Sequence, residues 1–285
     1  MGHATSKSDV EHLSMTDETF TQLRELIYEQ TGITFQPNQK YLLESRLLSR
    51  LKRHKLGSYQ DYYDYLRRDP YRDKELTSLY ALITTNETYF YRDIPQLDTF
   101  MGTIVPASME ANKASRQLRI WSAACSTGDE VYTLAILLQE HPPLSGWTID
   151  LLGTDLSDVV LEKAMAGVYG AHTLRHVPPA LKAKYFAEHK GLFALSSDIK
   201  QRVKLMNLNL YDRPRLKLIR GMDVIFCRNC LIYFDDKAKH RILTDLHAAL
   251  KPSGYLVIGF SESLTHMATL FRPIHAGRSV VYQKV

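Results

Sequence analysis

The stretch WSAACSTGDEVYTLAILL, residues 121–138, decides the fold of this 285-residue chain. It joins the end of an apolar strand, a tight turn and the start of an apolar helix, the unit from which nucleotide-binding α/β domains are built. A turn that binds pyrophosphate carries several glycines for close backbone approach, but this turn has only Gly128. Asp129 and Glu130 follow directly and would repel phosphate. The turn therefore argues against NAD or ATP and favours a ligand without phosphate.

Short apolar strands alternate with helices around this turn, from Gln117 onward. The segments are, in order, QLRIWSA, EVYTLAILLQEH, TIDLLGTDL, DVVLEKAMAG, MDVIFCRN, KAKHRILTDLHAAL and GYLVIGF. Such alternation is typical of parallel βαβ units and predicts a doubly wound sheet. RPIHAG and SVVYQKV then predict a closing antiparallel hairpin. We therefore expect an α/β domain over residues 117–285 with the outline of a Rossmann-like methyltransferase, an outline that alone fixes no chemistry.

One connection in this domain is longer than an ordinary crossover. Residues 178–209 hold a short helix and two or three alternating strands. We expect a small antiparallel β-subdomain inserted at about residues 178–207.

The beginning of the chain has an entirely helical pattern. The Thr-Asp-Glu triplet at residues 16–18 can cap a helix that ends at Gly32, and three further helical segments follow. We expect a flexible N-terminus over residues 1–14, an all-α domain over 15–85 and an interdomain linker over 86–116. The first six residues also match the myristoylation pattern M-G-x-x-x-[ST], which is short enough to occur by chance.

Composition limits the class of protein. The chain is 45% hydrophobic and 24% charged with a net charge of +5, which is typical of a globular protein. No apolar run approaches the ~18 residues of a membrane span, and the N-terminus lacks a hydrophobic signal region, so we expect a cytoplasmic protein without membrane insertion. Three cysteines argue against a disulfide scaffold. Cys227 and Cys230 form one C-x-x-C without further ligands, which we interpret as packing residues, and we expect no metal.

A second candidate ligand residue follows the turn by about 25 positions. The segment GTDLS places Asp155 at the end of the second strand, where a carboxylate can accept both hydrogens of a ribose diol. Capping of the helix that starts at Ser157 is an equal alternative. The acidic turn suits a ligand with an ammonium group. Both features together favour S-adenosylmethionine, whose methionine portion carries that group.

Five motifs occur in a fixed order along the chain. They are TTNETYFYRD, WSAACSTGDEVYT, GTDLS, NLNL and FCRNCLIYF. In this order and spacing they resemble the CheR family, the chemotaxis-receptor glutamate methyltransferases of bacteria. The resemblance covers residues 15–285, including the helical domain. It implies a Rossmann-like class I methyltransferase domain that uses S-adenosylmethionine to methylate glutamates of methyl-accepting chemotaxis receptors, with S-adenosylhomocysteine as product.

The resemblance also assigns site residues. It implies that the cofactor is bound by Asn86, Thr88, Arg92, Glu130, Asp155, Asn209, Leu210, Arg228 and Asn229. It places Tyr233 beside the transferred methyl group and makes Arg92 and Tyr233 the catalytic residues. The family turn more often reads Gly-Glu-Glu-Pro-Tyr-Ser than Gly-Asp-Glu-Val-Tyr-Thr, so only the second acid is carried over. Helix capping by Asn86 and Thr88, a turn role for Asn229 and core packing of Tyr233 are the structural alternatives.

A carboxylate acceptor requires alignment more than proton transfer. A glutamate has a reference pKa of about 4.3, so it is ionised near neutral pH and needs no general base. The protein must align and desolvate the reacting groups. Arg92 is a plausible clamp because its planar fork matches a carboxylate, and Tyr233 can direct its hydroxyl at the transferring group and exclude water.

A cationic helix is the predicted receptor contact. The segment QKYLLESRLLSRLKRHKLGS has leucines on one face and cations on another. The resemblance implies that this face contacts the acidic methylation helices of the receptor through Arg46, Arg50, Lys52 and Arg53. A solvated face, nucleic acid and an anionic membrane are the alternatives. Some family members also bind a receptor's C-terminal tether pentapeptide on the β-subdomain. The segment FAEHKGLFAL is shorter here, which favours tether independence.

Two other functions fit parts of the pattern. The basic helix and the tyrosines fit a nucleic-acid methyltransferase, but nucleobase enzymes of this fold often carry Asn/Asp-Pro-Pro-Tyr/Phe where this chain reads CRNC. A non-catalytic binding module would have no physical need to keep Arg92, Asp155, Asn229 and Tyr233 together. We therefore expect a receptor methyltransferase, associated with receptor arrays at the membrane, and no nucleic-acid partner.

Overall fold

The computed structural model describes residues 13–264 and 267–285, which form two compact units divided between Thr85 and Asn86. The myristoylation pattern and most of the expected flexible N-terminus lie outside the described residues. None of the helices in the described part of the chain is long and apolar enough to cross a membrane.

The first unit is helical, as expected. It contains α1 (Asp17–Thr31), η1 (Pro37–Gln39), α2 (Lys40–His54), α3 (Tyr59–Arg68) and α4 (Arg72–Ile83). The side chain of Thr16 accepts a hydrogen bond from the backbone of Thr19 and begins α1, and Gly32, with a φ of 73°, ends it. Leu43, Leu47 and Leu51 lie on the buried face of α2.

A buried carboxylate joins three helices of this unit. Glu75 of α4 accepts hydrogen bonds from Arg50 Nε (2.7 Å) and Nη2 (2.5 Å), from His54 Nε2 (2.7 Å) and from the Tyr62 hydroxyl (2.7 Å). Burial alone would raise the pKa of Glu75, but the hydrogen bonds from Arg50, Tyr62 and His54 outweigh it and the pKa is lowered. Part of the cationic face of α2 is therefore used inside the unit.

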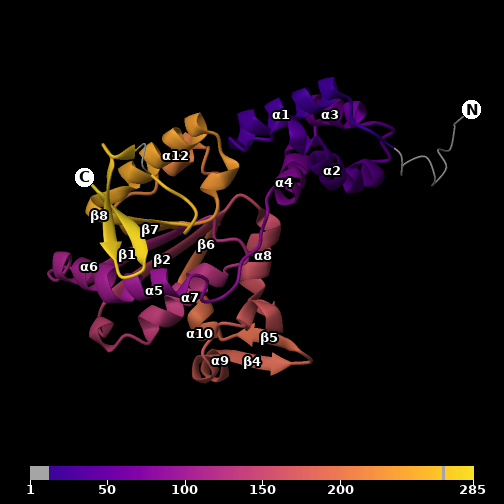
Figure 1. The fold of residues 1–285 in the computed structure, drawn as a ribbon. Helices are drawn as coiled ribbons and strands as arrows, with labels where there is room; N and C mark the ends of the chain where they lie inside the picture. Colours follow the sequence, from indigo (N-terminus) through magenta and orange to yellow (C-terminus); the bar gives the residue numbers. More distant parts are fainter. Residues whose placement is uncertain (1–12, 265–266) are drawn as a thin grey trace, which may run out of the picture. The chain divides into compact units, whose positions relative to one another are not determined.

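The second unit is built on a seven-stranded sheet of order β6-β2-β1-β7-β8-β10-β9 (Figure 1). The strands from β6 to β8 run parallel, whereas β10 pairs antiparallel with both β8 and β9. The strands are β1 (Gln117–Ala123), β2 (Thr148–Asp155), β6 (Val203–Asn207), β7 (Met222–Cys227), β8 (Leu250–Ile258), β9 (Phe271–Ala276) and β10 (Ser279–Lys284). The predicted doubly wound sheet with an antiparallel C-terminal hairpin is confirmed.

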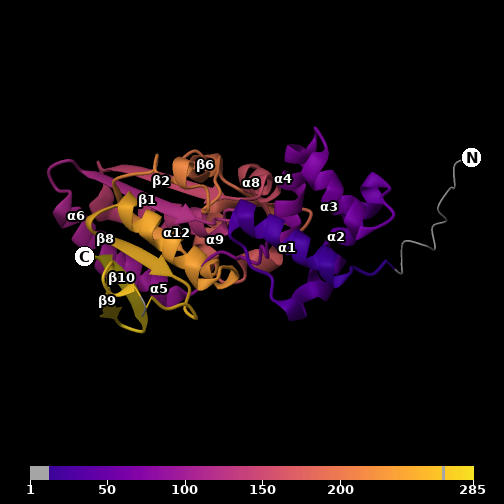
Figure 2. The same cartoon turned by 90° about the horizontal axis from the view of Figure 1, so that it is seen from above.

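Helices cover both faces of this sheet. The larger helical elements are α5 (Ile94–Thr99), the π-helical turn η2 (Phe100–Ile104), α6 (Val105–Ala111), α7 (Asp129–Gln139), α8 (Asp158–Ala166) and α12 (Asp236–Ala249). Figure 1 shows α12 above the sheet and α5 and α7 below it, and in Figure 2 α12 lies in front of the strands. Strand β1 alternates accordingly, because Leu118 and Ile120 belong to the core with α7, and Trp121 to the core with α12.

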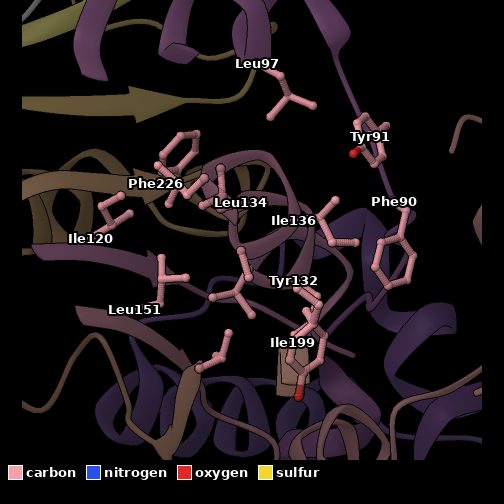
Figure 3. Packing of buried hydrophobic residues seen from close by; sticks show 14 of the residues in the cluster. Phe90, Tyr91, Leu97, Ile120, Tyr132, Leu134, Ile136, Leu151, Ile199 and Phe226 are labelled. Carbon is pink, nitrogen blue, oxygen red and sulfur yellow. The ribbon is translucent and has the colours of Figure 1, made fainter. Parts of the chain in front are cut away.

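The segment 86–116, which we expected to be an interdomain linker, belongs to the second unit. Phe90, Phe100 and Ile104 are fully buried in the core of that unit, part of which is seen in Figure 3. The ring of Phe100 packs edge-on against Phe226 of β7, 5.2 Å between ring centroids. Burial of these side chains makes the segment a structural layer of the domain.

The inserted subdomain is present, but its bounds differ from those expected. Its sheet has the order β3-β5-β4, with β3 (Val168–Gly170), β4 (Phe186–His189) and β5 (Leu192–Leu195). It therefore starts before residue 178, and β6, which we had placed in the insertion, pairs with β2 in the main sheet. The insertion lies in the connection from β2 to β6, which pair in parallel and therefore need a long crossover. The remaining short elements are η3 (Pro142–Leu144), η4 (Ala171–Leu174), α9 (Pro179–Tyr185), α10 (Ser197–Lys200), α11 (Arg213–Leu216) and η5 (Leu231–Tyr233).

Candidate functional site

The candidate site lies where three neighbouring parallel strands end. Strands β2, β1 and β7 are adjacent, with Ala123 paired to Thr154 and Ser122 to Phe226. The turn after β1, Asp155 at the end of β2 and the turn after β7 therefore meet at one edge of the sheet.

The single glycine of the turn after β1 allows the chain to enter helix α7. Gly128 has a φ of 87° and precedes α7, and a Cβ atom there would lie 2.7 Å from a ring carbon of Tyr132 and 3.0 Å from Ala164 Cβ. Three backbone N–H groups of the turn are already used. Cys125 N–H donates to Thr154 O, Ser126 N–H to Asp155 Oδ2 and Gly128 N–H to Cys125 O. These groups are not available to cradle a phosphate, in agreement with the argument from the glycine count.

Asp155 is buried, and its contacts include the capping alternative. Its Oδ1 accepts from the backbone N–H of Ser157 (3.0 Å), and its Oδ2 from Ser126 N–H (2.8 Å). Burial raises the pKa of Asp155 despite these hydrogen bonds. Each carboxylate oxygen keeps a lone pair, because a carboxylate offers about four acceptor positions. Asp155 thus ties the ends of β1 and β2 together and retains acceptor capacity.

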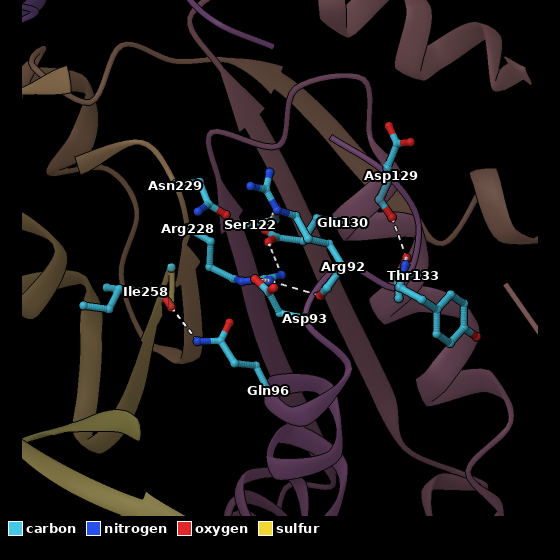
Figure 4. A network of polar contacts seen from close by, with 12 residues as sticks. Arg92, Asp93, Gln96, Ser122, Asp129, Glu130, Thr133, Arg228, Asn229 and Ile258 are labelled. Carbon is cyan, nitrogen blue, oxygen red and sulfur yellow. Dashed lines mark hydrogen bonds and ion pairs between the residues drawn. The ribbon is translucent and has the colours of Figure 1, made fainter. Parts of the chain in front are cut away.

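The central feature of the site is a buried ion network around Arg228. Its Nη1 donates to Glu130 Oε2 (3.0 Å), and its Nη2 donates to Asp93 Oδ2 (2.5 Å) and to Arg92 O (3.0 Å). Glu130 also accepts from the Ser122 hydroxyl (2.7 Å). The network, drawn in Figure 4, joins β1, α7, the turn after β7 and the segment that enters α5.

The Arg92 guanidinium takes no part in the described hydrogen bonds of that network. Its Nη1 donates to Glu87 O (3.0 Å), and the guanidinium lies 5.5 Å from the ring centroid of Tyr89. Arg175 covers the same ring at 3.7 Å. Arg228 contacts only the backbone carbonyl of Arg92. The Arg92 side chain is half-buried and keeps N–H donors that could bind an anion.

The other predicted site residues occupy the same edge of the sheet in different ways. Asn86 accepts a hydrogen bond from the Ser126 hydroxyl (3.1 Å) with its backbone oxygen, and Thr88 is half-buried two residues on. Asn209 forms a local turn, its Oδ1 accepting from Tyr211 N–H (2.9 Å), and Leu210 is buried.

The turn after β7 carries two further predicted residues. Asn229 has a φ of 57°, in the left-handed region, and Tyr233 is half-buried at the end of η5. The thiols of Cys227 and Cys230 in the same turn are 3.2 Å apart and buried.

Asp129, which we had not carried over, is fully buried beside the turn. Its Oδ2 accepts from the Thr127 hydroxyl (2.5 Å), whereas Oδ1 has no partner among the described residues. Burial raises the pKa of Asp129 to about 6. It is a core carboxyl group next to the site.

The four predicted receptor-contact cations divide into two pairs. Lys52 and Arg53 are exposed on α2. Arg50 binds Glu75, and Arg46 donates to the carbonyl of Ile83 and to the hydroxyl of Thr85 (3.0 Å). The helical period alone placed all four on a polar face but did not show which of them have partners inside the unit.

Sequence reasoning missed several polar residues of this edge. They are Ser122, Asp93, Ser126 and Glu262. Asp93 could have been found, because it follows Arg92 in the motif TTNETYFYRD, and Ser122 and Ser126 lie in the motif WSAACSTGDEVYT. Glu262 lies in none of the five motifs. No group of three or more metal-ligating side chains in the described ranges is arranged to hold a metal ion.

Comparison with known proteins gives matches along almost the whole chain. The family model "CheR methyltransferase, SAM binding domain" matches residues 86–280, and "CheR methyltransferase, all-alpha domain" matches residues 18–84. Chemotaxis protein methyltransferase 2 of Vibrio cholerae is 34% identical over 272 residues, which are 95% of this chain and 94% of that protein. The chemotaxis protein methyltransferase of Borreliella burgdorferi is 33% identical over 89% of this chain and 90% of that protein.

Proposed function

Because the chain belongs to the CheR methyltransferase family and is an S-adenosylmethionine-dependent methyltransferase, we propose that it methylates glutamate carboxylates of bacterial chemoreceptors. The family membership confirms the resemblance drawn from the five motifs. The observation that carries the proposal is the Arg228 network, which holds Glu130 and the backbone of Arg92 at the edge of the sheet where Asp155 also ends its strand.

The residues at this edge fit S-adenosylmethionine. The turn has its backbone N–H groups engaged and presents carboxylates, which suits a nucleoside without phosphate. We assign Asp155 to the ribose, Glu130 to the amino group, and Asn209 and Leu210 to the adenine. Asn86, Thr88, Arg92, Arg228 and Asn229 would enclose the methionine end. When bound, the cofactor supplies a methyl group activated by a positively charged sulfur.

The chain's own residues then have positioning roles. Arg228 keeps Glu130 and the backbone of Arg92 in place through two charged acceptors and one carbonyl. The Arg92 guanidinium has donors left to orient an acceptor carboxylate, and Tyr233 excludes water beside it. A glutamate acceptor is already ionised near neutral pH, so no residue is required to remove a proton.

We assign the receptor contact to the exposed cations of α2. Lys52 and Arg53 are free to meet acidic methylation helices, whereas Arg50 and Arg46 support the helix from inside the unit. Opposite charge would speed the encounter, with a strong dependence on salt. Lys52→Glu with Arg53→Glu should lower the initial rate of receptor methylation at low salt and leave S-adenosylhomocysteine binding unchanged.

We propose that docking does not require a receptor tether. The β4–β5 hairpin of the small sheet closes through Lys190 and Gly191, both with positive φ, which is the tightest hairpin connection. Saturable micromolar binding of a peptide with the receptor C-terminus would contradict this proposal. The chain would act in the cytoplasm at receptor arrays.

Incubation with labelled S-adenosylmethionine and receptor membranes tests the whole proposal. Base-labile label on the receptor protein is expected, because glutamate methyl esters hydrolyse in base. Label on nucleic acid alone, or cofactor binding without any transfer, would refute it. Arg92→Ala and Tyr233→Phe should lower turnover with little change in thermal stability; unfolding of these variants would show that the residues are core packing.

A further inference from the structure

A carboxylate outside the predicted set connects the ends of β7 and β8. Glu262, four residues after β8, accepts hydrogen bonds from three backbone N–H groups. Its Oε2 accepts from Gly259 (2.6 Å) and Asn229 (3.0 Å), and its Oε1 accepts from Ile232 (3.3 Å). Two of the three donors belong to the turn that carries the assigned site residues Asn229 and Tyr233.

The chain is closely packed around this carboxylate. A Cβ atom on Gly259 would lie 2.8 Å from Asn229 Nδ2, 2.8 Å from Glu262 Oε2 and 2.9 Å from Asn229 N. The ends of β7 and β8 therefore approach so closely that only glycine fits between the asparagine and the carboxylate. The side-chain amide of Asn229 thus lies beside Gly259, directly after β8.

The conformation of the turn needs such support. Asn229 has a φ of 57°, in the left-handed region that residues other than glycine seldom adopt. Its N–H and that of Ile232 both point to one charged acceptor, and hydrogen bonds to a charged group are roughly twice as strong as neutral ones. A neutral side chain at position 262 would hold this turn less firmly.

We propose that Glu262 is a positioning residue, which fixes the turn from Asn229 to Tyr233 in the orientation that the cofactor and the acceptor carboxylate require. This inference rests on the proposed function, because Asn229 and Tyr233 have their roles only there. Glu262 itself does not contact the Arg228 network in the described hydrogen bonds. It acts on the other side of the turn, from the end of β8.

The Glu262→Gln variant tests the inference, because the amide keeps the shape but places an N–H₂ group against backbone donors. We expect the dissociation constant of S-adenosylhomocysteine to rise about tenfold and turnover at saturating cofactor to fall at least tenfold. The thermal midpoint should change little. Glu162→Gln, at an exposed position of α8, is the matched control and should leave all three values unchanged.

A double-mutant cycle distinguishes positioning from general structural support. If Glu262 acts through the turn, Glu262→Gln combined with Tyr233→Phe should lower turnover little more than the worse single variant. Full multiplication of the two effects, or wild-type affinity and turnover in a folded Glu262→Gln variant, would overturn the inference. Should Glu262→Gln not fold, Glu262→Asp keeps the charge with a shorter side chain, and wild-type values for that variant would overturn the inference equally.

The binding of S-adenosylhomocysteine distinguishes a failure of this inference from a failure of the proposed function. S-adenosylhomocysteine binding can be measured whether or not receptors are the substrate. Absence of receptor methylation by the unaltered protein would refute the proposed function, whereas an unchanged dissociation constant in Glu262→Gln would refute the role of Glu262.

Discussion

Replacement of Arg228 by glutamine should disable the site and destabilise the second unit. The Arg228 side chain is 2% exposed and donates to Glu130, to Asp93 and to the Arg92 carbonyl. Glutamine is shorter and neutral, so it cannot reach three acceptors. Glu130, 14% exposed, would keep only the Ser122 hydroxyl among its described contacts.

The magnitude follows from the burial of the groups that remain. Removal of one partner of a buried ion pair costs about 3–5 kcal/mol, because the other charge stays desolvated. Asp93 is 31% exposed and water can solvate it, so we expect the lower part of this range, about 3 kcal/mol. For a unit of about 200 residues, a loss of this size lowers the unfolding midpoint by about 6–12 °C.

Tryptophan fluorescence is a suitable assay, because both tryptophans, Trp121 and Trp147, lie in the second unit. The thermal midpoint should fall as stated, and titration below that midpoint should show at least tenfold weaker binding of S-adenosylhomocysteine. Arg278→Gln is the matched control, since Arg278 is exposed in the β9–β10 turn and its replacement should change neither value.

Two results would refute this reasoning. A midpoint within 2 °C of the unaltered protein would show that the network contributes little to stability. A lowered midpoint with unchanged S-adenosylhomocysteine affinity would show that Arg228 supports the fold but does not shape the ligand site.

Three further changes test separate parts of the structure. Gly128→Ala should lower stability by about 1–3 kcal/mol more than Gly146→Ala, because both glycines have positive φ but only the first lacks space for a Cβ atom; equal midpoints in tryptophan fluorescence would contradict this. Asp129, whose pKa burial raises to about 6, makes the folded state lose stability as pH rises from about 4 to 6. Between pH 4 and pH 6, the free energy of unfolding of Asp129→Asn should therefore rise by about 3 kcal/mol relative to that of the unaltered protein. A difference that chemical denaturation shows to be independent of pH would contradict this. Glu75→Gln should destabilise the first unit by about 3–5 kcal/mol, seen as an early transition in circular dichroism without one in tryptophan fluorescence; coincident transitions would contradict it.

Local patterns predicted most of the elements correctly. The cap at Thr16 and the stop at Gly32 bound α1, and the leucine period of α2 corresponds to its buried face. The alternation of strands and helices predicted the parallel sheet, and the last two strands form the predicted hairpin. These features depend on residues a few positions apart, which a sequence displays directly.

The boundaries that failed depend on distant partners. The segment 86–116 was predicted to be a linker, because the burial of Phe100 against Phe226 of β7 joins residues far apart in the chain. Strand β6 was predicted to belong to the insertion, because its partner β2 precedes the whole subdomain in the sequence. Neither relation has a local signal.

The site shows the same division between chemistry and position. Glu130, Asp155, Arg228 and Asn229 could be named from the motifs, since their place in turns and at a strand end and the shortage of glycine after β1 are properties of the sequence. That Arg228 joins Glu130, 98 positions away, and that Glu262 holds Asn229 from 33 positions away were decided by the tertiary structure. The physical reason is that parallel strands bring their carboxyl ends to one edge of a sheet, so charges far apart in the chain become neighbours only when the sheet forms.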